Sequence, residues 1–429
     1  KGVYMKSRPV FLAKIGITTS VLLVTIFIIP LNDSMNVVVA FFTLVMSGIL
    51  LYKSRNNTLM TLIAFFILYS NYSIVVGEYL VGGELGVPFY EMKTPEYYGM
   101  AIKILFVFMF TVTLFYEDRQ INATHCYLEP RNNLLIFIVL VLLLLYILVF
   151  EVDRSPRLGY SVRISPMYEY SGLVFLLAFY YSKASFFSNT LLIGLASVFI
   201  VQDMIFGGRI TSLQLMIFLA TTIFVHKLSF RRILIGGFAG MFLNSVVGVY
   251  RSSYTLTRSL KDIFVDLLSG YLVFDTPVYA YFASVTHIAA SKVASSNVRY
   301  TSLWSFVKSI VFSSNEISAN VTSLVARDYF WNLGGGLMPT HFFFWLGWIG
   351  VVIIACIVVC VLNRIGSHGS SDLLVLITMA ITVYSPRWYL YSPLAFVRGP
   401  FVFVPLMYML LGIGDMIIRK SDVTKGIPH

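Results

Sequence analysis

The stretch LLIFIVLVLLLLYILVF, residues 134–150, is an unbroken run of seventeen apolar residues without a charge. A helix needs about 20 mostly apolar residues to cross the hydrocarbon core of a bilayer. Similar stretches recur through the chain, near 10–30, 35–52, 58–81, 97–116, 134–150, 167–182, 188–206, 209–226, 230–249, 340–363, 372–385 and 400–418. We therefore expect an all-α polytopic membrane protein with about twelve transmembrane helices.

The composition excludes several other classes of protein. Of the 429 residues, 58% are apolar and 12% are charged, whereas soluble domains are about 45–50% apolar and about 25% charged. The net charge of +11 comes from basic residues scattered between apolar runs, not from one polar face. No nucleic-acid partner is therefore expected. Cys356 and Cys360 lie one helical turn apart without a histidine or acid beside them, so we expect no metal site there.

The Lys and Arg residues predict the orientation of the chain. We divide it into residues 1–249 with spans 1–9, a large outer segment 250–339, and residues 340–429 with spans 10–12 and a tail. With the N-terminus inside, the inner segments hold fifteen Lys and Arg residues and the short outer loops hold seven. Cytoplasmic loops carry the excess of positive charge, so both termini are predicted to be cytoplasmic. The seven outer residues are Lys93, Arg154, Arg157, Arg163, Arg209, Arg387 and Arg398.

Six of those seven outer residues are arginines, and arginine binds phosphate through its planar guanidinium. Arg157 and Arg163 share the loop 151–166, and Arg209 follows two glycines at the start of a span. Arg387 and Arg398 flank an aromatic stretch between the last spans. The outer face is therefore predicted to hold an anion. Interfacial anchoring, or pairing with acids such as Asp203, would explain the same charges.

The segment 250–339 is too apolar for a soluble domain. Arg251 and Arg258 lie on one face of a predicted helix, where they would meet an anionic ligand or lipid head groups. VRYTSLWSFVKSIVF (298–312) predicts an amphipathic helix in the membrane interface, with Leu303, Phe306, Val307, Ile310 and Val311 as its apolar face. Asp262, Asp266, Asp275 and Pro277 interrupt the apolar stretch 262–285, which favours half-helices or a re-entrant piece. Two further crossings here, giving fourteen spans, are the alternative.

Two motifs carry a resemblance to a known family. They are FGGRITSLQLMIF (206–218) and the glycine-rich GGGLMPTHFFFWLGWIG (334–350), which runs into a late span. With about twelve spans and one large late outer loop, the chain resembles the bacterial O-antigen polymerases (the Wzy family) and, more distantly, the O-antigen ligases. The resemblance implies a C-type glycosyltransferase-like fold with one large periplasmic loop, in the bacterial inner membrane.

The resemblance also implies an activity. The family transfers a growing glycan from undecaprenyl diphosphate to the outermost sugar of another undecaprenyl-diphosphate-linked repeat unit, without metal, cofactor or nucleotide sugar. A chain-length-determining co-polymerase is the implied protein partner, and membrane lipids surround the chain.

A site for this reaction needs cations for the leaving diphosphate and a general base for the attacking hydroxyl. Our catalytic candidates are His341, which follows the glycine loop, and Arg209. The predicted diphosphate-binding residues are Arg157, Arg163, Arg251, Arg258, Arg387 and Arg398. The other outer residues able to act as bases are His287, Asp328, Glu316, Asp275 and Glu169.

Four other functions compete with this hypothesis. A lipid-linked oligosaccharide flippase or other transporter should carry basic residues along the middle of its spans, where this sequence has only Lys14 and Lys103. A metal-dependent transferase should carry acids in its first outer loop, where Asp33 stands alone. An O-antigen ligase would share the chemistry and differ in its acceptor. A non-enzymatic scaffold would leave the outer arginines unexplained.

Overall fold

The computed structural model describes residues 8–80, 94–117, 128–152, 165–183, 185–205, 209–253, 273–312, 316–365 and 371–424. These residues form helices and no strand. Within them, seven helices are long and apolar enough to cross a membrane. The protein is therefore an all-α, membrane-embedded protein. Each of the twelve stretches predicted to span overlaps a helix of the structure, while the number that cross the bilayer stays a prediction.

The chain divides into two compact units. Unit 1 contains residues 1–120, 267–365 and 389–393. Its helices are α2 (Arg8–Leu23), α3 (Asp33–Lys53), α4 (Thr58–Ile74), α5 (Pro95–Phe115), α13 (Asp275–Val293), α14 (Ser296–Val311), α15 (Val321–Asp328) and α16 (Met338–Leu362). The π-helical turns η1 (Val24–Ile28) and η2 (Val75–Leu80) extend α2 and α4, and the 3₁₀ turn η6 (Ile317–Ala319) precedes α15.

Unit 2 contains residues 121–266, 366–388 and 394–429. Its helices are α6 (Leu134–Phe150), α7 (Pro166–Glu169), α8 (Ser171–Tyr181), α9 (Phe186–Ile205), α10 (Ile210–Thr221), α11 (Phe230–Ser253), α17 (Asp372–Val383), α19 (Pro393–Arg398) and α20 (Val404–Thr424). The 3₁₀ turn η5 (Val225–Lys227) precedes α11, and the π-helical turn η7 (Gly399–Phe403) precedes α20. Helix α18 (Ser385–Leu390) begins in unit 2 and ends in unit 1.

Asparagine begins three of the apolar helices. The side chains of Asn32, Asn57 and Asn133 accept hydrogen bonds from backbone N–H groups in the first turns of α3, α4 and α6, respectively. A capping side chain satisfies an N–H group that has no partner inside the helix. A single asparagine before each apolar run therefore fixes where the helix starts.

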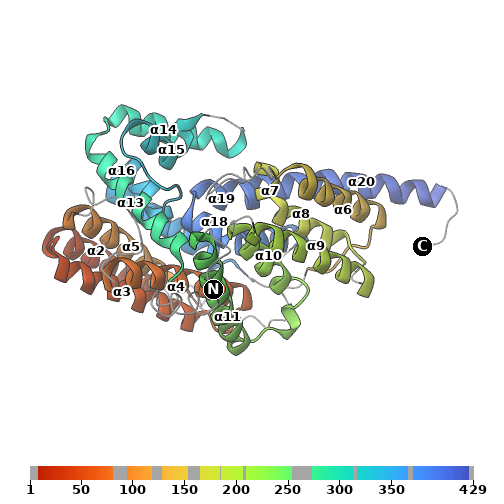
Figure 1. Cartoon of the computed structure of the whole chain (residues 1–429), viewed down its shortest axis with the longest axis horizontal. Helices are drawn as coiled ribbons and strands as arrows, with labels where there is room; N and C mark the ends of the chain where they lie inside the picture. The colour runs from red at the N-terminus through yellow and green to blue at the C-terminus, as the bar shows by residue number, and fades with distance from the viewer. Residues whose placement is uncertain are drawn as a thin grey trace. The chain divides into compact units, whose positions relative to one another are not determined.

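Helix α5 is the centre of unit 1, where it packs on α3, α13 and α16 (Figure 1). Its residues Leu105, Phe108 and Met109 are buried. Helix α6 of unit 2 differs, because it buries one face around Leu140 and Leu144 and leaves Leu135 and Leu142 exposed. An apolar helix with an open apolar face is stable in lipid, where that face meets acyl chains instead of water.

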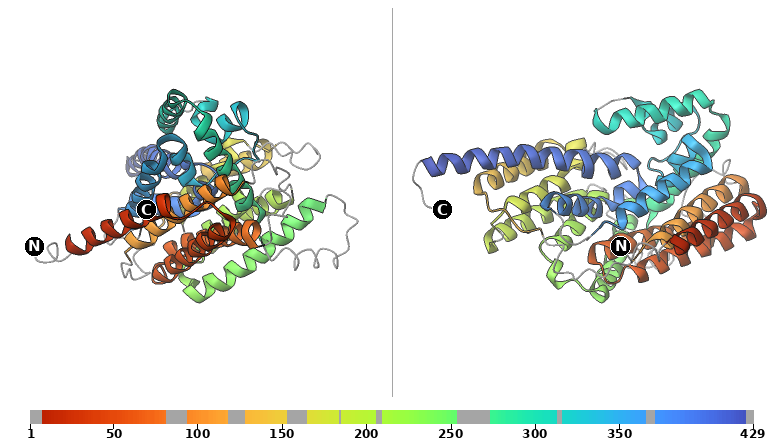
Figure 2. Two further views of the ribbon diagram at one scale, coloured as in Figure 1. Left: turned by 90° about the vertical axis from the view of Figure 1, so that its left-hand side faces the viewer. Right: turned by 180° about the vertical axis from the view of Figure 1, so that it is seen from behind.

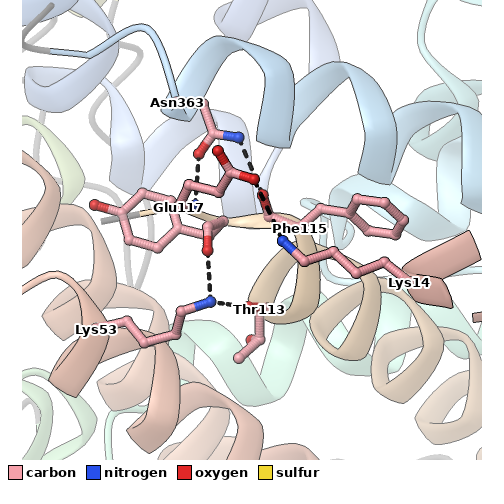
Figure 3. Close-up of polar contacts among 7 residues, drawn as sticks. Lys14, Lys53, Thr113, Phe115, Glu117 and Asn363 are labelled. Carbon is pink, nitrogen blue, oxygen red and sulfur yellow. Dashed lines mark hydrogen bonds and ion pairs between the residues drawn. The ribbon is translucent and has the colours of Figure 1, made fainter. Parts of the chain in front are cut away.

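The ends of α3, α5 and α16 meet in one polar cluster of unit 1 (Figure 3). Lys53 donates hydrogen bonds to the carbonyl oxygens of Thr113 (2.7 Å) and Tyr116 (2.5 Å). Asn363, just after α16, accepts from the Glu117 backbone N–H at 3.0 Å. Glu117 also pairs with Lys14 of α2 at 3.4 Å. These are the ends that the predicted topology places on the inner side.

Polar contacts also join the ends of helices within unit 2. Asp415 of α20 accepts a hydrogen bond from Asn133 at 2.7 Å and pairs with Arg131 at 3.3 Å, just before α6. The hydroxyl of Tyr180, at the end of α8, donates to Asp372 at the start of α17 (2.7 Å). These contacts join the ends of neighbouring helices, and the topology stays a prediction. Which side is cytoplasmic stays a prediction.

Candidate functional site

Two of the predicted arginines meet around one tyrosine in unit 2. Arg387 of α18 forms an ion pair with Glu169 of α7. The Tyr384 hydroxyl donates to the backbone oxygen of Glu169 at 3.0 Å. The ring of Tyr170 stacks on that of Tyr384, with centroids 6.0 Å apart. We call Glu169, Tyr170, Tyr384, Arg387 and Arg398 the arginine cluster.

Arg398, at the end of α19, is the half-buried cation of this cluster. The positive charges of Arg398 and Arg387 both act on the Tyr170 hydroxyl, so both guanidinium groups lie near that side chain. Within the described part of the chain, Arg398 forms no ion pair. The cluster thus joins a neutralised arginine, a half-buried arginine and stacked aromatic rings.

Small residues allow this close packing. Gly172 of α8 lies against Tyr384, since an added Cβ there would be 3.6 Å from the tyrosine ring. Gly399 lies against Leu173 in the same way, at 3.4 Å. Both distances are those of ordinary van der Waals contact, so these glycines lie at the packing surface around the arginine cluster.

Arg209 is only 4% exposed and directly precedes α10. Nearby, the Asp203 carboxylate accepts hydrogen bonds from the backbone N–H (2.9 Å) and the hydroxyl (2.8 Å) of Ser212. Asp203 therefore holds the first turn of α10 against α9. The two glycines before Arg209 lie outside the described residues, and its catalytic role stays a prediction.

The remaining predicted arginines cannot be placed at a site. Arg157, Arg163 and Arg258 lie outside the described residues. For Arg251, the structure describes only a backbone position near the end of α11.

Unit 1 brings two of the predicted bases, both histidines, together. The rings of His287 (α13) and His341 (α16) lie 4.7 Å apart between centroids, and both side chains are buried. We call them the histidine pair. His287 contacts the Thr322 hydroxyl through Nε2 at 3.1 Å and the Thr340 hydroxyl through Nδ1 at 3.4 Å. The sequence named both residues as possible bases but gave no sign that they touch.

The glycine loop lies directly over the histidine pair. Gly334, Gly335 and Gly336 have φ values of 89°, 79° and 138°, a region that other residues rarely enter. A Cβ on Gly336 would lie 2.5 Å from His287 Cε1 and 2.9 Å from His341 Nε2. Glycine is therefore required here by both conformation and space.

The polar groups of this loop are bonded within unit 1. The Gly336 N–H donates to the Leu390 carbonyl at 2.9 Å. The Thr322 hydroxyl donates to the Gly335 carbonyl. The sequence predicted a loop able to bring N–H groups to a ligand, but the Gly336 N–H bonds the chain itself. The loop ties α15 and α18 to the histidine pair.

Several other predicted residues have structural partners. Asp328 forms a bidentate ion pair with Arg327 (2.5 Å and 2.6 Å), which lowers the pKa of that carboxyl. The Lys103 amine donates to the Ile29 carbonyl at 2.5 Å and so satisfies the end of η1. Their contacts explain these charges without a ligand.

Sequence reasoning missed Glu78. This carboxylate is buried in η2, beside Tyr79, Tyr98 and Tyr281. The Tyr79 and Tyr281 hydroxyls bond each other at 2.5 Å. An acid within the predicted span 58–81 was a visible signal, because charges inside spans commonly mark functional positions.

Among the described residues, no group of three or more His, Cys, Asp or Glu side chains forms a candidate metal site. In comparisons with family models, curated proteins and solved structures, nothing matched the chain.

Proposed function

We propose that this protein is a membrane glycosyltransferase that acts on polyprenyl-diphosphate-linked glycans. More narrowly, we propose an O-antigen polymerase that joins undecaprenyl-diphosphate-linked repeat units at the periplasmic face of the bacterial inner membrane. Both termini would be cytoplasmic, and a chain-length-determining co-polymerase would be its partner.

The observation that carries the proposal is the convergence of Arg387 and Arg398 on Tyr170. A lipid diphosphate needs a guanidinium whose charge is not already neutralised, and Arg398 meets that requirement within the described residues. Guanidinium groups pair with phosphate oxygens through two parallel hydrogen bonds. Tyr170 is partly exposed, so its ring would offer an apolar face to a sugar beside that group, whereas Tyr384 is fully buried. Arg387 is already paired with Glu169, so it would position the other residues of the cluster as well as bind the diphosphate.

The proposed reaction transfers a glycan without a covalent enzyme intermediate. An acceptor hydroxyl oxygen bonds to the anomeric carbon of the donor glycan. The bond from that carbon to the diphosphate oxygen breaks, and undecaprenyl diphosphate leaves with the bonding electrons. Arginine stabilises the charge that develops on the leaving group. The hydroxyl proton passes to a general base; the sequence predicts His341 for that role.

Substitution of Arg398 tests the proposal. We expect Arg398→Ala to reduce polymer formation by about 100-fold, as is typical when one stabilising donor is removed from a transition state. Arg398→Lys should form an amount of polymer between that of Arg398→Ala and that of the native protein, because lysine keeps the charge and lacks the planar guanidinium. The measurement is the surface-polysaccharide ladder on a gel, at equal protein level.

The matched control is Arg232→Ala. Arg232 lies on the predicted inner face and donates to the Lys227 carbonyl, so its loss should leave the ladder unchanged. A normal ladder with Arg398→Ala would contradict the proposed diphosphate site. A normal ladder with His341→Gln would remove only the proposed base.

A further inference from the structure

Helix α14 has an unusual distribution of side chains. Tyr300, Trp304, Val307 and Val311 follow at steps of four, three and four, which places them on one helical face. They are 60%, 60%, 44% and 63% exposed. We call these four residues the α14 stripe. Contact between such a face and water is unfavourable, so a contiguous apolar surface usually marks a place that a membrane or another molecule covers.

The opposite face of α14 is polar and buried. Ser302, Ser305 and Ser309 point into unit 1, where Ser302 donates to the Ser318 carbonyl at 2.8 Å. The inward face therefore consists of these serines and Phe306, and the four residues of the α14 stripe face outward. An outward face with four large apolar side chains indicates an apolar environment outside.

Helix α14 packs against the first turns of α16. The Trp345 indole N–H donates to the Ser302 hydroxyl at 3.0 Å, and the Trp345 ring lies 4.7 Å from that of Phe306. Trp345 belongs to the first turns of α16, a candidate span. The start of a span lies at the boundary between hydrocarbon and water. Helix α14 lies against this start of α16, and α15 lies beside α14 (Figures 1 and 2).

Helix α14 is itself unsuited to cross the bilayer. It has 16 residues, or roughly 24 Å at 1.5 Å per residue. It carries Arg299 and Lys308 and no acidic residue. The Lys308 amine lies 5.7 Å from the centroid of the Trp304 ring. Tryptophan, tyrosine and basic residues together are typical of the membrane interface, where anionic head groups attract the cations.

We propose that α14 lies flat on the bilayer and inserts the α14 stripe into the head-group boundary of the leaflet that α16 enters. Its partner is a phospholipid surface that contains anionic head groups. Helix α15, which follows α14, contains Thr322, whose hydroxyl bonds His287 and the Gly335 carbonyl. The bilayer surface thereby sets the position of the segment that touches the histidine pair.

Tryptophan fluorescence of the full chain in lipid nanodiscs tests this proposal. The discs would contain phosphatidylcholine and phosphatidylglycerol, with a share of the phosphatidylcholine spin-labelled near the head group. Emission of the native chain minus that of Trp304→Phe isolates Trp304 from the other tryptophans. We expect the labelled lipid to remove at least half of the difference emission, and aqueous acrylamide to remove little of it.

Two substitutions sharpen the test. Val311→Asp places a charge within the α14 stripe and should make Trp304 accessible to acrylamide. Thr301→Asp adds the same charge at an exposed position outside the α14 stripe and should leave Trp304 protected from acrylamide.

Quenching of Trp304 in the native chain by acrylamide alone would place the α14 stripe in water. Protection from both quenchers would mean that a second copy or another protein covers it. Either result overturns the proposal.

Discussion

At the scale of single residues, the strictest requirement lies at Gly336. Its backbone conformation and its contact with the histidine pair both exclude a side chain. The sequence showed three consecutive glycines, which predicted a permissive loop but not what the loop touches. That contact depends on how α13, α15 and α16 pack, and a local sequence pattern does not report such packing.

We expect Gly336→Ala to destabilise the protein by about 2–4 kcal/mol, since strain at positive φ adds to overpacking against His287 and His341. Gly334→Ala is the control, because Gly334 also has a positive φ but a Cβ there would meet nothing within 4 Å. It should cost only about 1 kcal/mol. Thermal unfolding in detergent measures both, and equal losses would contradict the described packing.

At the scale of helices, the apolar runs predicted where helices lie. The charged and proline residues that interrupt those runs were a poorer guide. Asp275 and Pro277 were interpreted as interruptions of the stretch 262–285. In the structure they begin α13, as an acid and a proline in the first turn commonly do. Helix α14 was predicted as amphipathic, with Phe306 and Val311 on the same face. Phe306 is buried and Val311 is exposed, because the serines give α14 its inward face.

The helix starts allow a matched comparison. Asn133→Ala removes both the cap of α6 and a hydrogen bond to the buried Asp415, so we expect a loss of about 2–4 kcal/mol. Asn32→Ala removes the cap of α3 and should cost about 1 kcal/mol. Unfolding midpoints in denaturant, converted with a common slope, give the two values. A larger loss for Asn32→Ala would contradict the Asn133–Asp415 contact.

At the scale of the whole molecule, composition predicted an all-α membrane protein, and the structure agrees. The candidate site was less predictable. Arg387 and Arg398 were chosen because outer arginines oppose the usual charge distribution. Both arginines lie near Tyr170, and Arg387 pairs with Glu169. These contacts join segments that are far apart in the chain. Glu78 lies within the predicted span 58–81, and its burial beside tyrosines from three segments depends on packing that a local sequence pattern does not report.

The central claim is that the protein polymerises lipid-linked repeat units. It is tested most directly by the surface-polysaccharide ladder of cells from which this gene alone has been deleted. We predict that long chains disappear while core carrying a single repeat unit remains, and that the intact gene restores the long chains. Loss of the single-unit band as well would assign the protein to flipping, ligation or unit assembly, and would contradict the account.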